Sequence, residues 1–358
     1  MTAAVGLLAL TVSGAAAGTT WTLVPVPDIS GAAPNLLSVS CAAPDNCITV
    51  GNVMPASGAP TFAISESWNG SAWTAASVAQ PVHTNSDVLN SVSCVAADYC
   101  MAVGSFELTD KKHTTETLTE LWDGSTWTIE EPNAVANIGL TSVSCASASF
   151  CAAQGDGVIE VWNGSMWSEA ASVSRNNDLS VISCPTTAGC YVADGDRVAY
   201  WDGGTGLTRK SLATPAGGGN YGIDSITCPA AQSCTAVGYD NTAPLAEAWN
   251  GSAWAIEPTP APAKTSASDL VSVSCVSTAN CTAVGAKYPA QKENTEPLAE
   301  RWNGSGHWGV ANIPPPGDGD SNQFFADSCA TTVNCMAVGL YTTTSGRDAL
   351  AYVLQPTS

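Results

Sequence analysis

Fourteen cysteines provide the most regular chemistry in this sequence, because they form seven pairs whose members are separated by five residues. The pairs are Cys41 and Cys47, Cys94 and Cys100, Cys145 and Cys151, Cys184 and Cys190, Cys228 and Cys234, Cys275 and Cys281, and Cys329 and Cys335. Zinc sites usually space their cysteines by about two to four residues, and redox-active thiols need electropositive surroundings that an acidic chain does not favour. We therefore expect seven structural disulfides and an oxidising, extracellular compartment.

A second motif with coordination chemistry is Asp318-Gly-Asp320-Ser-Asn322, whose oxygen atoms recur at alternate positions as in a calcium loop. However, Gln323 stands where an EF-hand loop has glycine, and Cys329 occupies the twelfth position in place of glutamate. Two interpretations remain open at this stage, a calcium site or a plain Gly-Asp turn.

Candidate ligand-binding residues are the polar side chains in the loops that differ most between repeats. They are His83, Asp87, His113, Asp178, Tyr221, Asp224, Asp240 and Asp269. Each has a simpler interpretation as a solvated loop residue. Two carboxylates such as Asp87 and Asp269 would suit acid and base catalysis on a glycosidic bond if the fold brought them within about 5 to 10 Å. No Gly-rich phosphate loop, metal-type histidine cluster or Ser-His-Asp motif stands out.

The elements that position these residues follow from an internal repeat. Each unit contains Ser-x-Ser-Cys, five residues, Cys-x-Ala-Val-Gly, a variable loop, a strand that ends in Trp, an Asn-Gly or Asp-Gly turn, and a strand that opens with Trp. Successive first cysteines lie 39 to 54 residues apart, the period of four-stranded propeller blades. The alternating pattern and the turn residues predict strands and hairpins throughout. We expect an all-β, seven-bladed propeller with antiparallel blades.

The two ends of the chain predict that the ring is closed. The seventh repeat has a third strand at Ala349-Leu-Ala-Tyr-Val-Leu354 but no fourth strand after it, whereas Gly18-Thr-Thr-Trp21 matches the fourth-strand segment Gly70-Ser-Ala-Trp73. The N-terminal strand should therefore complete the last blade. An open solenoid would instead need atypical capping repeats.

Residues that recur in every blade are expected to serve the scaffold. The Trp pairs on either side of the Asn-Gly turns should fill the space between blades, although a ring of sugar-stacking platforms is the alternative. A glutamate precedes the first Trp of a pair by two residues at Glu66, Glu120, Glu160, Glu247 and Glu300. Five copies favour a structural partner, such as an indole N–H, over a catalytic acid.

Composition and the N-terminus indicate export. Residues Val5 to Val12 are apolar and precede Ser13-Gly-Ala-Ala-Ala17, which predicts a signal peptide over 1–17 and a single propeller domain over 18–358. The apolar run is too short to cross a bilayer. With 11 basic against 31 acidic residues, the chain should repel nucleic acid and anionic membranes.

The repeat unit resembles repeats in secreted actinobacterial proteins that have no assigned function. More remotely, the hairpin Trp122-Asp-Gly-Ser-Thr-Trp127 is similar to turns in bacterial β-propeller lectins, which implies sugar binding between blades but assigns no binding residue here.

The sequence therefore favours a secreted, monomeric, non-catalytic binding module for a carbohydrate or another extracellular ligand. An extracellular glycoside hydrolase or lyase with carboxylates at the propeller funnel is one alternative, and a protein-interaction scaffold is another. Fold alone does not choose between them.

Overall fold

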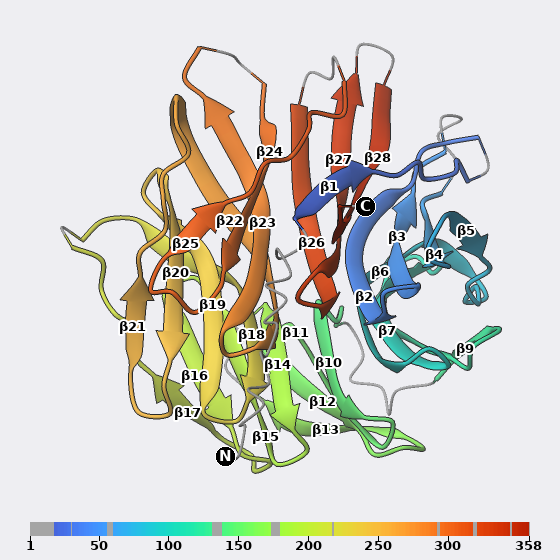
Figure 1. The fold of residues 1–358 in the computed structure, drawn as a ribbon. Coiled ribbons are helices and arrows are strands. Elements are labelled where there is room, and N and C mark those ends of the chain that lie inside the picture. Colours follow the sequence, from blue (N-terminus) through green and yellow to red (C-terminus); the bar gives the residue numbers. More distant parts are fainter. Residues whose placement is uncertain are drawn as a thin grey trace, which may run out of the picture.

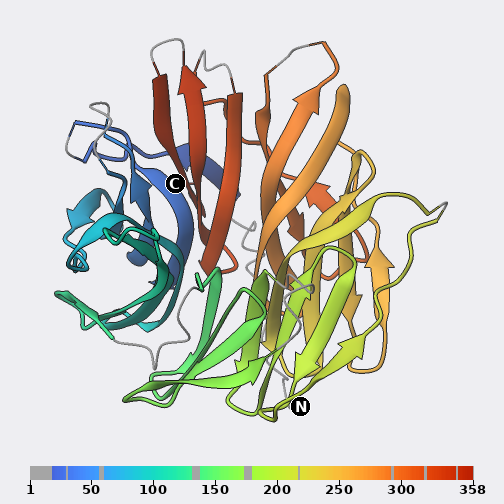
Figure 2. The same ribbon diagram turned by 180° about the vertical axis from the view of Figure 1, so that it is seen from behind.

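Seven four-stranded antiparallel sheets follow one another around a ring in the described part of the chain (Figures 1 and 2). The structure is a computed structural model that describes residues 18–29, 31–55, 60–130, 138–172, 180–216, 218–291, 294–317, 321–343 and 346–357. Each sheet is a blade, numbered 1 to 7 in chain order, and the first strand of each blade lies innermost, against its counterparts in the neighbouring blades. The predicted all-β, seven-bladed propeller is confirmed.

The first four blades use strands β2 to β17. Blade 1 comprises β2 (Asn35–Ala43), β3 (Asn46–Val53), β4 (Phe62–Trp68) and β5 (Trp73–Ala76). Blade 2 comprises β6 (Thr84–Ala96), β7 (Tyr99–Leu108), β8 (Thr115–Trp122) and β9 (Trp127–Ile129). Blade 3 comprises β10 (Ser142–Ser147), β11 (Phe150–Gly155), β12 (Val158–Trp162) and β13 (Trp167–Ser172). Blade 4 comprises β14 (Val181–Thr186), β15 (Gly189–Asp194), β16 (Arg197–Trp201) and β17 (Leu207–Lys210).

The remaining strands form blades 5 to 7. Blade 5 comprises β18 (Tyr221–Ala230), β19 (Ser233–Asp240), β20 (Ala243–Trp249) and β21 (Trp254–Glu257). Blade 6 comprises β22 (Thr265–Ser277), β23 (Asn280–Pro289), β24 (Glu296–Trp302) and β25 (Trp308–Val310). Blade 7 comprises β26 (Ser321–Thr331), β27 (Asn334–Thr343) and β28 (Gly346–Pro356), with β1 (Thr19–Leu23) as its outer strand.

The ring is closed by the two ends of the chain, as the sequence predicts. Strand β1 pairs antiparallel with β28, with Trp21 opposite Leu354, and Figure 1 shows the blue β1 beside the red strands of blade 7. The amide of Thr357 also donates to the carbonyl of Gly18 at 2.7 Å. Closure leaves no unfinished blade, so the edge strands are confined to the centre and the rim of the ring.

All seven cysteine pairs form disulfides in the structure. Each bridge joins the first strand of a blade to the second beside their connecting turn, with Cα atoms 3.9 to 4.1 Å apart. We call this end of the ring the disulfide face. Each closed loop is short, so one bridge contributes roughly 2 kcal/mol in the chain-entropy model.

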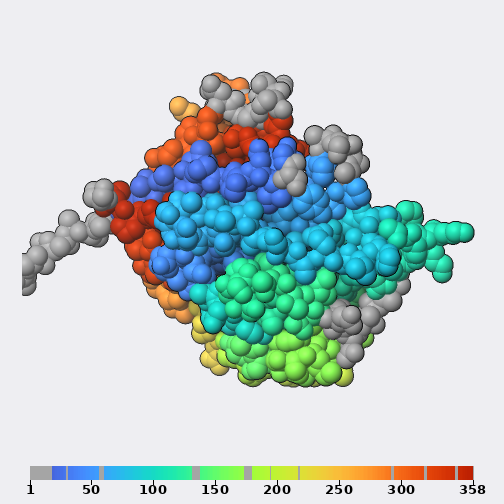
Figure 3. Space-filling view, turned by 90° about the vertical axis from the view of Figure 1, so that its right-hand side faces the viewer, coloured from blue at the N-terminus to red at the C-terminus, as the bar shows by residue number. Residues whose placement is uncertain are grey.

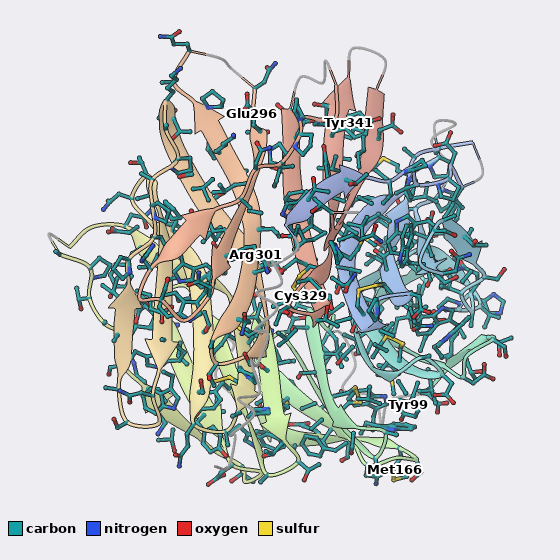
Figure 4. The ribbon with its side chains drawn as sticks, viewed as in Figure 1. Tyr99, Met166, Glu296, Arg301, Cys329 and Tyr341 are labelled. Carbon is teal, nitrogen blue, oxygen red and sulfur yellow. A yellow bond between two sulfur atoms is a disulfide. The ribbon has the colours of Figure 1, made fainter. Side chains whose placement is uncertain are left out.

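The opposite end of the ring is the loop face. It carries the connections between second and third strands and those from each outermost strand to the next blade. Figure 4 shows Glu296 and Tyr341 at this end, and Tyr99 and Met166 at the disulfide face. Because all blades share one four-stranded topology, each blade has the same kinds of strand connection at each face, and the connections differ in length.

A glycine in the second strand permits a bulge in the first. In blade 2 the pairing of β6 with β7 shifts between Leu89 and Ser91, and a Cβ atom on Gly104 would lie 1.9 Å from the carbonyl oxygen of Val88. A Cβ atom on the equivalent glycines of blades 1, 5, 6 and 7 would lie 1.9 to 2.2 Å from a first-strand carbonyl oxygen, and in blade 3 the carbonyl belongs to Gly139, just before β10. The glycine of the Ala-Val-Gly motif is therefore required by close backbone approach.

Serine side chains join the innermost strands of neighbouring blades. In six blades a serine precedes the first cysteine and accepts a hydrogen bond from a cysteine amide in the next blade, as Ser40 does from Cys94 at 2.9 Å. In blade 5 this position is Thr227. The same bond recurs in five more pairs of blades, including Ser328 to Cys41, which closes the ring. The serine two residues earlier accepts a second amide in five pairs, as Ser38 does from Val92. We call these contacts the serine belt.

Replacing Ser40 with alanine should destabilise the propeller by about 1 to 3 kcal/mol, because the partly buried amide of Cys94 loses the acceptor that Ser40 provides. Urea unfolding of the oxidised protein measures this change. Ser168→Ala is the control, since Ser168 is exposed on β13. Equal losses in the two variants would mean that the serine belt contributes little.

Candidate functional site

The Trp pairs pack between blades and expose little surface. Five pairs have ring centroids 5.5 to 6.1 Å apart, and nine of the ten rings are no more than 9% exposed, Trp302 being the half-buried exception. The neighbouring blade covers these faces, as in the core around Trp68 and Trp73 that includes Met336 and Val353 of blade 7. The packing interpretation of the Trp pairs therefore holds, and nine of the ten rings offer a sugar no open face between blades.

The five repeated glutamates are buried beside these tryptophans, each with at most 1% of its surface exposed. The predicted indole partner is wrong. Glu120 instead accepts the amide of Ala79 at 2.9 Å, and Glu247 accepts the amide of Ala213 at 2.8 Å. In both cases the donor comes from the loop that leaves the preceding blade.

Proline explains why two of the other glutamates have no such donor. Ala79 lies six residues after Trp73, which opens the outer strand of blade 1. The same count from Trp21 and Trp254 reaches Pro27 and Pro260, and proline has no N–H. The glutamates next along the chain, Glu66 and Glu300, have no hydrogen-bond partner at either oxygen within the described residues.

Burial raises the pKa of all five carboxyls. The pKa of Glu66 and of Glu300 rises to about 8, and that of Glu120 and of Glu247 to about 7, where burial dominates and the amide donor acts in the opposite direction. Burial, followed by the charge of Glu169, raises the pKa of Glu160 to about 7. Repetition and the absence of an open cavity make these groups part of the scaffold.

The loop face differs from blade to blade, because the connections between second and third strands differ in length. The connection between β7 and β8, teal in Figure 3, projects beyond the body of the ring. In blade 3 the same connection is only Asp156 and Gly157, both with positive φ, as the sequence predicts for a tight hairpin. Unequal loops on equal blades are what a single specific site requires.

A cavity of about 330 Å³ opens between blades 1 and 2 on the loop face. Its lining is polar apart from one aromatic ring and one valine. The residues used below are Asn52, Thr61, Ser86, Asp87, Phe106 and Glu107. They come from the loop ends of β3, β6 and β7 and from the segment before β4. We call this the blade 2 cavity.

Asp87 provides a buried acceptor in the wall of the blade 2 cavity. Its side chain belongs to a residue only 4% exposed, and its Oδ2 atom has no hydrogen-bond partner in the described residues. The Asp87 amide donates to the carbonyl of Thr61 at 3.2 Å, which ties β6 to blade 1. Burial, opposed by a bond from the Ala63 backbone, raises the pKa of Asp87.

Glu107, His113 and Asn85 form a hydrogen-bonded group at the rim of the same cavity. The Nδ1 atom of His113 lies 2.6 Å from Oε1 of Glu107, and Nδ2 of Asn85 donates to that oxygen at 3.0 Å. These hydrogen bonds, that from His113 first, lower the pKa of Glu107. These hydrogen bonds hold the three polar side chains in fixed positions at the exposed rim of the blade 2 cavity.

Three predicted residues, His83, Asp87 and His113, thus gather on blade 2. His83 and His113 both have left-handed backbone, with φ of 60° and 52°, and the carbonyl of His83 accepts the amide of Thr109 at 2.8 Å. Left-handed backbone at non-glycine residues is unusual and occurs often at ligand-binding sites, where the surrounding structure holds it.

The remaining candidates lie on other blades. Tyr221 and Asp240 face each other across β18 and β19, and Asp224 lies between the register positions of Ile223 and Ser225 in β18. Asp269 lies on β22, where its Oδ1 accepts the amide of Ala286 at 3.3 Å. Asp178 lies outside the described residues.

Asp87 and Asp269 belong to blades that do not touch. Blades 7 and 1 separate blade 6 from blade 2 on the shorter way around the ring. The carboxylate pair considered from the sequence is therefore not brought together within one blade or between adjacent blades.

The proposed calcium residues give no cluster within the part of the chain that is described. Asp318 and Asp320 lie outside that part. Asn322 is a buried residue of β26 whose amide donates to the carbonyl of Thr295 at 3.0 Å. Throughout the described ranges, no group of three or more His, Cys, Asp or Glu is arranged to hold a metal ion.

Sequence reasoning missed the residues that complete the blade 2 cavity. Asn52, Phe106 and Glu107 line the cavity and Asn85 lies at its rim, but none was a candidate, because each lies near the end of a strand that looks ordinary in isolation. The usable signal was the length of the loop between Gly104 and Leu118, which exceeds that in blades 3 and 4. Side-chain identity within that loop becomes informative only when the register is known.

No family model matches the chain, and no curated protein matches it in sequence. Solved structures do match its fold. YCF48 bound to D1 peptide has a TM-score of 0.63 at 10% identity over 95% of this chain and 96% of that chain. YCF48 from Cyanidioschyzon merolae has a TM-score of 0.61 at 12% identity over 94% and 99%.

A catalytically inactive virginiamycin B lyase from Staphylococcus aureus, with quinupristin, has a TM-score of 0.58 at 7% identity, and 94% of this chain and 99% of that chain are covered. At these identities the likeness shows a shared fold, and the chemistry must be argued from the residues above.

The buried carboxyls predict that stability falls as pH rises. A glutamate with a folded pKa near 8 and an unfolded pKa near 4.5 binds more protons in the native state between these values. Each group therefore stabilises the fold fully below about pH 4.5 and loses this contribution as pH rises toward 8. We expect the melting temperature to be lower at pH 8 than at pH 5.

Glu66→Gln tests the assignment of this effect, because glutamine has a similar shape and stays neutral. The variant should lose less stability than the parent between pH 5 and 8. The difference in free energy of unfolding should be on the order of 1 kcal/mol for each unit by which burial raises the pKa of Glu66. Asp45→Asn, which removes one exposed carboxyl on the disulfide face, is the control. Parallel pH profiles for Glu66→Gln and the parent would contradict the assignment.

Proposed function

We propose that this protein is a secreted, non-catalytic binding module that holds a carbohydrate on the loop face of its propeller. The blade 2 cavity carries the proposal. It combines about 330 Å³ of space with hydroxyl, amide and carboxyl groups and the ring of Phe106, on a frame stapled by disulfides. Such a concave site with few but oriented polar groups is typical of small-ligand recognition.

The composition of the lining suits a ligand rich in hydroxyl groups. The amide of Asn52 can both donate and accept, and Thr61 and Ser86 add hydroxyl groups to the lining. The side chain of Phe106 is half-buried, so part of one ring face is available to the C–H groups of a sugar. Neutral hydroxyls satisfy these groups without bringing an ion into an already acidic chain.

The register of blade 2 favours binding over glycosidic catalysis. Ser86 pairs with Glu107, and Asp87 pairs with Phe106. Side chains alternate across a strand, so the carboxyls of Asp87 and Glu107 leave opposite faces of the β6–β7 pair. That arrangement does not support the opposed acid and base that glycoside hydrolysis needs.

Secretion is supported by the seven disulfides, which are consistent with an oxidising compartment. No helix among the described residues is long and apolar enough to cross a membrane. We propose that residues 1–17 act as a signal peptide and that 18–358 form one domain, which we expect to be monomeric.

The first test is binding to an array of microbial and plant glycans, followed by calorimetry with each hit. We expect one site per chain, and Asp87→Asn should weaken binding about tenfold because it removes the charged form of the buried acceptor. Asp45→Asn on the disulfide face should bind like the parent. Both variants should keep the parent melting behaviour at neutral pH.

Other outcomes of this assay would replace the proposal. Several equivalent sites per chain would move recognition to the repeated Trp pairs, and turnover of the glycan would indicate an enzyme. Absence of glycan binding, together with capture of a defined extracellular protein, would leave a protein-interaction scaffold.

Export has a separate test. Expression in a secreting bacterial host should release a protein whose N-terminal residue is Gly18, because the small residues before it suit signal peptidase. N-terminal sequencing of the released protein measures this directly. Retention of residues 1–17 on a released chain would contradict the signal-peptide assignment.

A further inference from the structure

A second cavity on the loop face, of about 570 Å³, lies at blade 6. Its lining carries two lysines and one glutamate. The residues that matter are Lys264, Thr265, Lys287, Pro289, Gln291 and Glu296. They come from the segment that enters β22, the end of β23 and the start of β24. We call this the blade 6 cavity.

The backbone around the blade 6 cavity is held in place by specific contacts. Lys264 has a left-handed conformation with φ of 63°, which is unusual for lysine. Its carbonyl accepts the amide of Ala290 at 2.9 Å, and the hydroxyl of Ser266 donates to the carbonyl of Tyr288 at 3.0 Å. The entering loop is thereby fastened to the second strand of the blade.

Blade 2 contains the same backbone arrangement. His83 occupies the position of Lys264 when the two blades are aligned on their first cysteines. It has φ of 60°, and its carbonyl accepts the amide of Thr109 at 2.8 Å. The two cavities thus rest on matching frames, and their differences lie in the side chains.

Charge separates the two cavities. The blade 2 cavity is lined by Asp87 and Glu107 and by no lysine, whereas the blade 6 cavity is lined by Lys264 and Lys287. Two cations in one cavity are notable in a chain with 11 basic and 31 acidic residues. A neutral ligand alone gives no reason to gather them there.

The two lysines are not equally free to bind. The Nζ atom of Lys287 lies 3.2 Å from the Oε2 atom of Glu296, and both side chains are about one-third exposed. Lys264 is exposed and makes no ion pair within the described residues. An incoming anion would therefore meet Lys264 directly and would share Lys287 with Glu296.

We propose that the blade 6 cavity is an anion subsite that recognises the carboxylate or sulfate group of an acidic saccharide. This inference rests on the proposed glycan-binding function and specifies its ligand class. Lys264 supplies the principal charge, Lys287 a second one, and the fastened loop keeps Lys264 at the cavity.

The test compares matched saccharides by calorimetry at about 20 mM and 200 mM salt. An oligogalacturonate and its full methyl ester share one sugar backbone and differ in charge, and a sulfated neutral oligosaccharide of equal length presents sulfate as the other anion. The free acid or the sulfated chain should bind about tenfold more tightly than the ester at low salt, and the difference should shrink at high salt. The arm that shows the larger preference identifies the anion.

Lysine variants connect this preference to the cavity. Lys264→Gln should reduce the preference for the acidic saccharide about three- to fivefold, as expected for a partly exposed charge pair, without changing affinity for the ester. Lys111→Gln, which removes an equal charge at the exposed tip of blade 2, should leave both affinities unchanged. A melting curve for each variant verifies that it is folded.

The possible failures are distinct. Equal affinity for acid, sulfate and ester would overturn the anion subsite while leaving glycan binding intact. A charge preference that survives Lys264→Gln, or that Lys111→Gln removes equally, would place it elsewhere and also overturn the inference. Failure of all three saccharides and of every neutral glycan to bind would overturn the proposed function together with the subsite.

Discussion

The propeller depends on satisfying the innermost strand of each blade, because that strand has one edge without a partner strand. Its amides would be left unpaired where neighbouring blades crowd the centre. The serine belt solves this problem with side chains, as in the bonds from Cys94 to Ser40 and from Cys41 to Ser328. Hydroxyls reach between strands that diverge too much to form a common sheet, so each blade is tied to the next without losing its own twist.

Scaffold and site can be separated by how often a residue recurs. The buried glutamates look catalytic one at a time, since burial raises the pKa of Glu66 to about 8. The same glutamate occurs at the equivalent position of five blades, which instead indicates a shared structural role. Their local variation has a local cause, because Ala79 donates an amide to Glu120 whereas Pro260 has none to give to Glu300. Replacing the donor residue by proline thus changes the hydrogen bonding of a buried glutamate without opening a cavity beside it.

Sequence reasoning predicted the ring, its closure and the disulfides because those depend on repeated residue types at fixed spacing. It placed His83, Asp87 and His113 in variable loops. The structure gathers them on one blade, but Asp87 lies within strand β6, where it pairs with Phe106. It could not find Glu107 or Phe106, since their meaning depends on cross-strand register. It also assigned the wrong partner to Glu120, because the donor, Ala79, is a backbone group of another blade and leaves no trace in residue type.

Specific recognition on a repeating ring requires that some blades depart from the repeat without loosening it. Blades 2 and 6 do so at the same place, with left-handed His83 and Lys264 fastening the entering loops. Because the fastening uses a backbone carbonyl, the side chain at that position is free to change from imidazole to ammonium. The frame can thus be kept while the chemistry differs, so one face can offer an acidic, hydroxyl-rich cavity and a cationic cavity.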